Sequence, residues 1–149
     1  MPTLTAKQAD AIAKLLNERN QLTVEYTRER VMQEADDYRF TEREPGEVVA
    51  CVQIKRVQWY QFEVCHLTVA SGSEGKGLAK GLLREVERFA RSRNARLLQC
   101  TIREDNERSR NLFKSFGFRQ VGMFFNEHST NNVGVYQKVL APSRSPTQV

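Results

Sequence analysis

Apolar residues recur at helical spacing near the start of the chain, in one stripe formed by Ala9, Ile12, Ala13 and Leu16. The Thr-x-x-Gln pattern of residues 5–8 precedes this stripe and is a capping box, which predicts where the helix begins. We expect this helix to stop near Asn20. A second helix is predicted over residues 27–35, with Val31 and Met32 on its buried side.

Beyond residue 37 the apolar pattern takes the period of strands. Alternating and β-branched residues predict a three-stranded meander at 38–41, 47–57 and 62–69. A glycine-rich loop at 71–77 leads into an amphipathic helix that ends near Arg93. The remaining predicted elements are a strand at 95–102, a helix at 106–116 with Gly117 at its C-cap, and strands at 119–126 and 133–139. This order predicts an α+β fold in which helices and a central sheet form three layers, an α/β three-layer arrangement.

The composition is that of an ordinary globular protein. The chain has 149 residues, of which 40% are hydrophobic and 28% are charged. We expect a single domain over residues 1–140 and a flexible C-terminal tail at 141–149, which shows no apolar pattern. No apolar run approaches the roughly 18 residues of a spanning helix, and the first residues do not resemble a signal peptide. We therefore expect a cytoplasmic protein without a membrane partner.

The net charge of +5, with an isoelectric point near 9.3, favours anionic partners. The basic residues are spread along the chain rather than gathered in one tract, so a nucleic-acid partner is not expected, and a cofactor with several phosphates fits the charge at least as well. The three cysteines, Cys51, Cys65 and Cys100, contain no Cys-x-x-Cys spacing. They predict reduced thiols in apolar runs, with no disulfide framework and no metal site.

The loop Gly75-Lys76-Gly77 between a strand and a long helix suits an anion. Glycines allow tight turns, and the helix N-terminus offers unpaired N–H groups at the positive end of the helix dipole. Lys76 and Lys80 add positive charge nearby. The Walker and dinucleotide spacings are absent, and a plain strand-to-helix turn is the alternative interpretation.

Residues 73–83, preceded by residues 65–69, and residues 106–118 form two segments. Together these segments resemble the GNAT superfamily of acyl-CoA-dependent N-acetyltransferases. Residues 73–83, preceded by 65–69, are similar to its motif Q/R-x-x-G-x-G/A, which falls on Glu74, Gly77 and Ala79. Residues 106–118 are similar to its second motif, N-x-x-A/S-x-x-L-Y-x-x-x-G-F. The resemblance covers roughly residues 22–140 and implies a GNAT-like mixed, mostly antiparallel central sheet flanked by helices.

The resemblance implies an N-acetyltransferase that moves an acetyl group from acetyl-CoA to a primary amine by direct attack in a ternary complex. The alternatives are a non-catalytic acyl-CoA-binding module and a nucleic-acid-associated protein on the same fold. By the same analogy a homodimer is expected. The residues do not select one acceptor amine. Carboxylates expected on the acceptor side, such as Glu25, Glu29 and Glu34 near Tyr26, would suit a cationic amine, unless they only form a solvated surface.

The family's coenzyme A contacts carry over to two groups of residues. Backbone groups of Leu67, Thr68 and Val69 would pair with the pantetheine arm, and the N–H near Leu67 would polarise the thioester carbonyl. The pyrophosphate site and the second motif would add Glu74, Gly75, Lys76, Gly77, Leu78, Ala79, Lys80, Asn106, Ser109 and Phe113. Asn106 is equally a helix N-cap, and the two roles are compatible. Glu74 stands where the family has Gln or Arg. A carboxylate beside phosphates is unfavourable unless it points away, so this difference would lower the affinity for the cofactor.

Glu63 is the candidate general base, because some family members have a catalytic glutamate at the same offset from the glycine loop. It interrupts an apolar strand, so burial would raise its pKa; the alternative is a solvent-facing glutamate. His66 is the rival base, with a structural or surface role as the alternative. Phe113 replaces the family's frequent proton-donating tyrosine, and Tyr136 is the substitute donor, unless it is an ordinary strand tyrosine.

Overall fold

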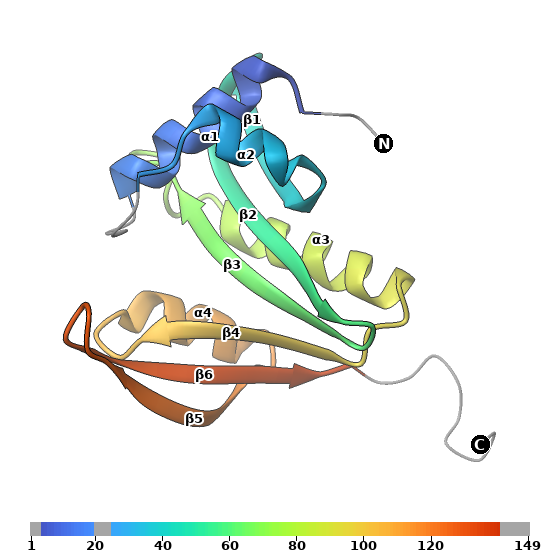
Figure 1. Cartoon of the computed structure of the whole chain (residues 1–149), viewed down its shortest axis with the longest axis vertical. Coiled ribbons are helices and arrows are strands. Elements are labelled where there is room, and N and C mark those ends of the chain that lie inside the picture. The colour runs from blue at the N-terminus through green and yellow to red at the C-terminus, as the bar shows by residue number, and fades with distance from the viewer. Residues whose placement is uncertain (1–3, 20–24, 141–149) are drawn as a thin grey trace. The chain divides into compact units, whose positions relative to one another are not determined.

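The computed structural model describes residues 4–19 and 25–140. Its helices are α1 (Ala6–Arg19), α2 (Arg28–Gln33), a 3₁₀ turn η1 (Ala35–Asp37), α3 (Leu78–Ser92) and α4 (Glu107–Ser115). Its strands are β1 (Tyr38–Glu44), β2 (Glu47–Gln58), β3 (Gln61–Val69), β4 (Leu97–Arg103), β5 (Arg119–Asn126) and β6 (Asn131–Val139) (Figure 1). The predicted element order is confirmed for this part of the chain. The expected stop at Asn20 and the expected tail at 141–149 lie outside the described residues.

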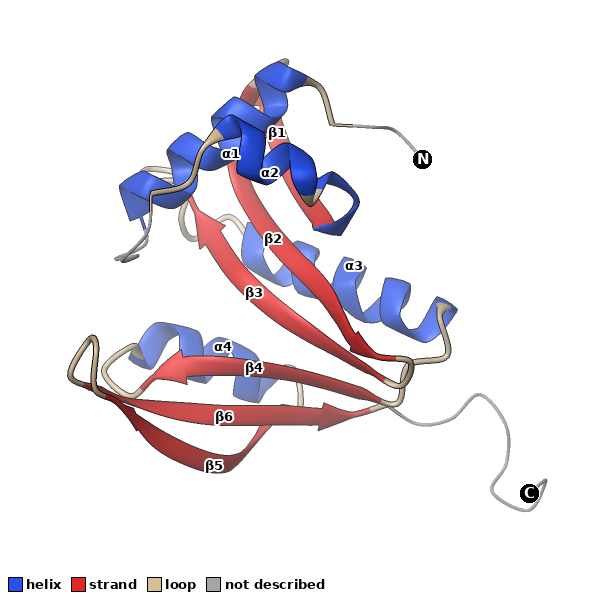
Figure 2. Cartoon of the chain, viewed as in Figure 1, coloured by secondary structure: helices blue, strands red, loops and turns tan. Residues whose placement is uncertain are grey.

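The strands form one mixed sheet in the order β1-β2-β3-β4-β6-β5 (Figure 2). β1 pairs antiparallel with β2, and β6 pairs antiparallel with both β4 and β5. β3 and β4 are parallel, and α3 lies in the crossover connection that a parallel pair needs. The expected mixed, mostly antiparallel sheet flanked by helices is confirmed.

The described residues form two compact units, and both are built from separate stretches of sequence. Unit 1 takes its residues from Met1–Ile54 and Cys65–Val86, and unit 2 from Lys55–Val64 and Glu87–Val149. The long elements β2, β3 and α3 each contribute to both units.

In unit 1, α1 and α2 cover one face of the β1–β2 ribbon and α3 lies behind the other (Figure 1). The capping box is confirmed: Thr5 N–H donates to Gln8 Oε1 at 3.0 Å, and Gln8 N–H donates to Thr5 Oγ1 at 3.1 Å. The apolar stripe of α1 is buried, as predicted. Val31 is also buried, but the prediction for Met32 is wrong, because it is 36% exposed. α2 has only six residues, and so short a helix buries one narrow stripe.

In unit 2, the core contains Leu98 and Ile102 of β4 with Phe113 of α4. Gly117 takes φ 91° directly after Phe116, the C-cap residue of α4, so the predicted glycine ends this helix in the left-handed conformation. β5 is an edge strand, and seven of its eight residues, Arg119–Phe125, are exposed, although four of them are large and apolar: Val121, Met123, Phe124 and Phe125.

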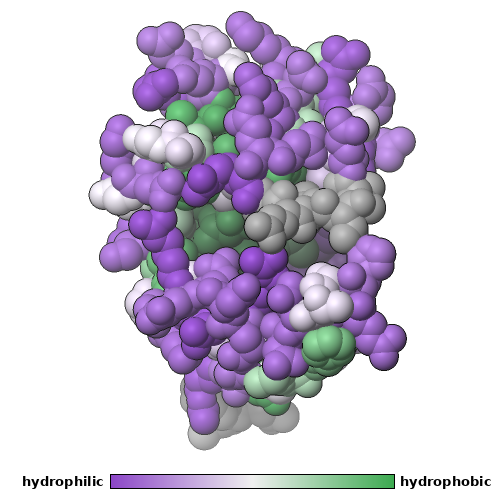
Figure 3. Space-filling model, turned by 90° about the vertical axis from the view of Figure 1, so that its left-hand side faces the viewer, coloured by the Kyte–Doolittle hydropathy of each residue, from purple (hydrophilic) through white to green (hydrophobic). Residues whose placement is uncertain are grey.

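Hydrophilic side chains cover most of the face in Figure 3, and hydrophobic ones are visible between them in its upper and middle parts and near its lower edge. Within residues 4–19 and 25–140, every helix is too short or too polar to cross a lipid bilayer.

Candidate active site

The glycine loop adopts a conformation that requires its glycines. Gly75 and Gly77 have φ of 78° and 76°, in the left-handed region that side chains disfavour. A Cβ atom at either position would meet nothing within 4 Å, so the backbone, not crowding, selects glycine here. Gly81 N–H donates to Gly77 O at 3.0 Å, which makes it an early bond of α3. The N–H groups of Leu78, Ala79 and Lys80, which precede it, can therefore face an anion at the positive end of a 15-residue helix.

Glu74, the unfavourable carboxylate of this loop, has a cationic partner. Arg19 Nη2 lies 3.1 Å from Glu74 Oε1, and Arg19 Nε donates to the backbone O of Val69 at 3.1 Å. Arg19 thus joins the last turn of α1 to the end of β3 and to the loop. The charge that the sequence places beside the expected phosphates is compensated within unit 1. Sequence reasoning missed Arg19, because the two residues lie 55 positions apart.

His66 interrupts β3 with a left-handed backbone conformation, φ 54°. Its carbonyl accepts a hydrogen bond from Thr68 Oγ1 at 2.9 Å. Its Nε2 lies 2.6 Å from the hydroxyl of Tyr26, and the two rings meet edge to face at 5.2 Å. Strained non-glycine residues concentrate at functional sites, because the surrounding structure must hold them there. His66 thus lies on β3, the strand where the thioester arm is expected, and Tyr26 holds its ring in place.

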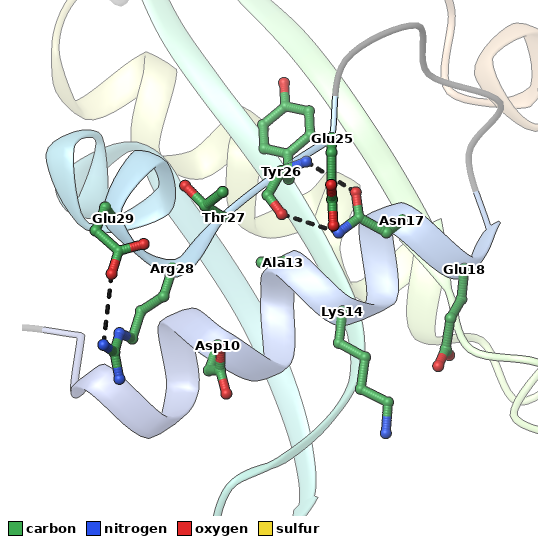
Figure 4. A pocket seen from close by; sticks show the side chains of 10 residues that line it. All are labelled: Asp10, Ala13, Lys14, Asn17, Glu18, Glu25, Tyr26, Thr27, Arg28 and Glu29. Carbon is green, nitrogen blue, oxygen red and sulfur yellow. Dashed lines mark hydrogen bonds and ion pairs between the residues drawn. The ribbon is translucent and has the colours of Figure 1, made fainter.

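The segment that carries Tyr26 is held by α1 through two hydrogen bonds to Asn17. Asn17 Nδ2 donates to Tyr26 O at 2.9 Å, and Tyr26 N–H donates to Asn17 Oδ1 at 2.8 Å. Asn17 and Tyr26 are among the residues that line a surface groove of about 620 Å³ between α1 and residues 25–29 (Figure 4). Glu25 and Glu29, expected on the acceptor side, line this groove, and the ring of Tyr26 points away from it. Sequence reasoning missed Asn17.

Beneath α2, two buried polar atoms lack a hydrogen-bond partner among the described residues: the hydroxyl of Tyr38 and Oε1 of Gln53. The register pairs these two residues across β1 and β2, so their side chains share one face. Gln53 Nε2 is bound to the carboxylate of Glu34. Burial raises the pKa of Tyr38 well above its ordinary value. Buried polar groups without a hydrogen-bond partner are rare in folded proteins, so each one needs a physical explanation.

Glu63, the candidate base, lies in unit 2 and is half-buried. Burial raises the pKa of its carboxyl above the ordinary 4.5, although a hydrogen bond from Gln99 Nε2 at 3.2 Å acts in the opposite direction. The expected direction of this shift is confirmed. Gln137 Nε2 in turn donates to Gln99 Oε1 at 2.7 Å, so one level of β3, β4 and β6 carries a row of hydrogen-bonded side chains. Sequence reasoning missed both glutamines.

Tyr136 is fully buried in unit 2, opposite Cys100, and its hydroxyl lies 3.5 Å from Gln120 Oε1. That position is the strand-core alternative stated for this residue. Its role as a proton donor stays a prediction.

The second motif is built around α4. Asn106 caps the helix, since its Oδ1 accepts a hydrogen bond from Ser109 N–H at 3.1 Å. Phe113 is buried and meets Phe118 edge to face at 5.0 Å, so it serves the core of unit 2 in a place where a hydroxyl would need a partner. The N-cap interpretation of Asn106 is confirmed. Contact of Asn106, Ser109 and Phe113 with a cofactor stays a prediction.

The three cysteines are free thiols. Burial raises the pKa of Cys51 to about 12, so this thiol is not a nucleophile at neutral pH. The described residues contain no cluster of three His, Cys, Asp or Glu side chains that could hold a metal ion.

Comparison with known proteins identifies the class to which this site belongs. The family model described as Acetyltransferase (GNAT) family matches residues 9–118, about three quarters of the chain. The chain therefore belongs to the GNAT acetyltransferase family, whose members transfer an acetyl group from acetyl-CoA to an amine.

Individual relatives agree with this membership. The chain is 31% identical over 71 residues to N-alpha-acetyltransferase RimI of Mycobacterium tuberculosis; the match covers 48% of this chain and 43% of that protein, less than half its length. Among solved structures, the ribosomal-protein-alanine N-acetyltransferase of Brucella melitensis superposes with a TM-score of 0.79, 23% identity and coverage of 93% and 98%. Rv2747 of Mycobacterium tuberculosis, solved with CoA and NLQ, superposes with a TM-score of 0.78 and 12% identity, and the match covers 94% of this chain and 98% of that chain. These two structural likenesses show the fold.

Proposed function

We propose that this chain is an acetyl-CoA-dependent N-acetyltransferase that moves an acetyl group to a primary amine by direct attack in a ternary complex. The observation that carries the proposal is the loop at 71–77, in which left-handed glycines lead from β3 into the open N-terminus of α3. This geometry suits a diphosphate. Family membership, which rests on the match over residues 9–118, indicates that this diphosphate is the one in coenzyme A.

In this proposal, the cofactor lies along β3 and the loop. The backbone groups of Leu67 and Val69 pair with the pantetheine arm, and the amides from Gly75 to Lys80 bind the pyrophosphate. Arg19 keeps Glu74 compensated, so the loop tolerates a carboxylate where the family motif has Gln or Arg. Asn106, Ser109 and Phe113 are assigned to the cofactor side by the second motif alone.

The acceptor amine attacks the thioester carbonyl as a neutral nucleophile, so a base must take its proton. We assign this role to Glu63, whose half-buried position raises its pKa toward the working range of a base. A C–N bond forms, and the N–H of Leu67 stabilises the carbonyl oxygen as it becomes negative. The C–S bond then breaks and the thiolate leaves. A thiol of pKa about 8.5 leaves without strong acid help, so Tyr136 or water can supply its proton.

His66 is the second candidate base, and one observation favours it. Its hydrogen bond to Tyr26 fixes the ring at the level of β3 where the thioester is expected. The two candidates differ in chemistry, since a neutral imidazole can accept a proton at pH 7 without burial.

For the acceptor, we propose the α-amino group of a peptide or protein. The support is the relative at 31% identity, whose name states acetylation at an N-alpha position. The cytoplasmic location and the homodimer expected from the sequence stay predictions.

Titration calorimetry with acetyl-CoA, followed by thiol release in the presence of amines, tests the function. The amines are a lysine-free peptide with a free α-amine, a second peptide that contains lysine and is blocked at its α-amine, and spermidine. We expect acetyl-CoA binding and turnover on the first peptide. Binding without turnover on any amine would favour the non-catalytic acyl-CoA module, which the hydroxyl-free Phe113 allows. No binding of acetyl-CoA or coenzyme A refutes both.

A further inference from the structure

The fold gathers basic residues that are dispersed in the sequence. Three segments of unit 2 meet at the turn between β2 and β3 (Figure 1): the turn itself, the chain between α3 and β4, and the end of β6. Arg96 N–H and Leu97 N–H both donate to Tyr60 O, at 2.8 and 3.0 Å, and Leu140 N–H donates to Arg96 O at 2.9 Å. These bonds place the three segments side by side.

Charge is concentrated where these segments meet. Residues 55–61, 87–97 and 136–140 contain seven lysines and arginines and one carboxylate, Glu87. Their formal charge of +6 exceeds the +5 of the whole chain, so all other residues together carry −1. Glu87 is engaged by Arg91 and Lys138. Within the described residues, no carboxylate forms an ion pair with Arg56, Arg93 or Arg96, which are all exposed.

Aromatic and apolar side chains are exposed among these cations. Trp59, the only tryptophan of the chain, is 57% exposed. The guanidinium of Arg96 lies 5.4 Å from its ring centroid, and Tyr60 meets it edge to face at 5.3 Å. Arg93 lies 5.1 Å from the ring of Phe89. Val57 and Val139 are 53% and 76% exposed. We call the set Arg56, Val57, Trp59, Tyr60, Arg93, Arg96 and Val139 the hairpin surface.

We propose that the hairpin surface binds single-stranded nucleic acid, with Trp59 as a stacking platform for a base and Arg56, Arg93 and Arg96 as contacts for phosphates. A single strand presents negative charge and flat bases in alternation, and this surface presents guanidinium groups beside an open indole. Guanidinium also suits phosphate better than ammonium does, because its planar fork donates two hydrogen bonds.

A polyacidic protein would match the charge but would leave the indole unused. An anionic bilayer would meet only four apolar or aromatic side chains, Val57, Trp59, Tyr60 and Val139, in place of an amphipathic helix face. Single-stranded nucleic acid uses both features. This binding does not require acetyl transfer, so an experiment that refutes one proposal leaves the other untouched. Binding would also bring the enzyme to a nucleoprotein.

The test uses the full chain and an oligouridylate of about 12 nucleotides, within the site size of about 4–16 nucleotides for stacking grooves. Fluorescence of Trp59 reports stacking directly, because no other tryptophan contributes. We expect quenching on binding, and affinity that falls with salt at a logarithmic slope of about −2, from three phosphates at about −0.7 each. An oligodeoxythymidylate of the same length tests whether DNA binds alike.

Variants separate stacking from charge. Trp59→Ala should weaken binding, measured by anisotropy of a labelled strand, by about 5- to 150-fold, while Trp59→Phe retains most of the affinity. Arg93→Gln or Arg96→Gln should make the salt slope less steep by about 0.7. Arg43→Gln is the control: it removes one positive charge from an exposed arginine of unit 1, which is paired with Glu47, and it should leave the slope unchanged.

Three results would overturn the proposal: no quenching of Trp59 by either strand, equal loss of affinity from Arg43→Gln and Arg93→Gln, or equal affinity of Trp59→Ala and the parent. Stronger binding to phosphatidylserine vesicles or to polyglutamate than to either oligonucleotide would also overturn it, in favour of a membrane or an acidic protein. Circular dichroism melting of each variant checks that the fold is intact. Acetyl-CoA affinity should be the same in all of them.

Discussion

Replacing Glu63 by glutamine separates its proposed catalytic role from its place in the fold. The amide keeps the length of the side chain and an oxygen that can accept the hydrogen bond from Gln99 Nε2. A positioned general base contributes about 10²- to 10⁴-fold to the rate, or about 3–5 kcal/mol of barrier at 1.36 kcal/mol per decade. We therefore expect kcat to fall by that factor in Glu63→Gln, with acetyl-CoA affinity unchanged.

The pH dependence gives a second, independent signature. Burial raises the pKa of Glu63 above 4.5 in the folded protein, and the active form is the carboxylate. The rate should thus rise with pH through this elevated pKa, and the rise should be absent in Glu63→Gln. Stability changes with pH in the opposite direction to the rate. The folded state binds the proton more tightly than the unfolded state, so the carboxylate lowers the free energy of unfolding above pH 4.5. Glu63→Gln should be at least as stable as the parent at pH 7, with the difference vanishing below pH 4.5.

Thiol release at saturating acetyl-CoA and chemical unfolding at pH 4 and pH 7 measure these quantities. His66→Gln is the companion variant, since it removes the rival base and leaves Glu63 in place. If Glu63→Gln keeps kcat within a few-fold of the parent and the same pH profile, Glu63 is not the base. Loss of turnover in His66→Gln alone, with a preserved melting temperature, assigns the role to His66.

Three further predictions concern the loop and the buried polar atoms of unit 1. Arg19→Gln should weaken acetyl-CoA binding by up to about 5-fold, and the double variant with Glu74→Gln should restore it, both by calorimetry. Gly77→Ala should lower the free energy of unfolding by about 1–2 kcal/mol, because φ is 76° there; Gly81→Ala, inside α3, should raise it by about 0.5–1 kcal/mol. Tyr38→Phe should raise the melting temperature by about 2–4 °C, because it removes an orphaned buried hydroxyl; a lower melting temperature would mean that the hydroxyl is satisfied.

Local patterns in the sequence sufficed for most of the fold. The capping box of residues 5–8, the stripes of α1 and α3, and Gly117 after α4 depend on neighbours within a few positions, so their structure could be predicted from spacing alone. Met32 shows the limit of this reasoning. Periodicity identifies a candidate face, but how much of that face is covered depends on the length of α2 and on what packs over it.

The partners of the candidate site residues could not be predicted in the same way. Glu63 has Gln99 as its partner, 36 positions away, and His66 has Tyr26, 40 positions away. Such pairs follow from strand register and from the path of the chain before α2, which no local pattern encodes. The sequence predicted candidate groups for the chemistry, but not the groups that hydrogen-bond to these candidates.

The same distinction explains why the sequence shows dispersed charge where the folded chain has a basic surface. Basic residues at 56, 93 and 96 are 40 positions apart at most, and a sequence scan finds no basic tract. The hydrogen bonds of Arg96 and Leu97 to Tyr60 bring these positions together around one exposed indole. Electrostatic potential depends on distance in space, and it falls off over about 8–10 Å at physiological salt. A dispersed charge in sequence can therefore act as a single anion-binding surface, distinct from the glycine loop proposed for coenzyme A.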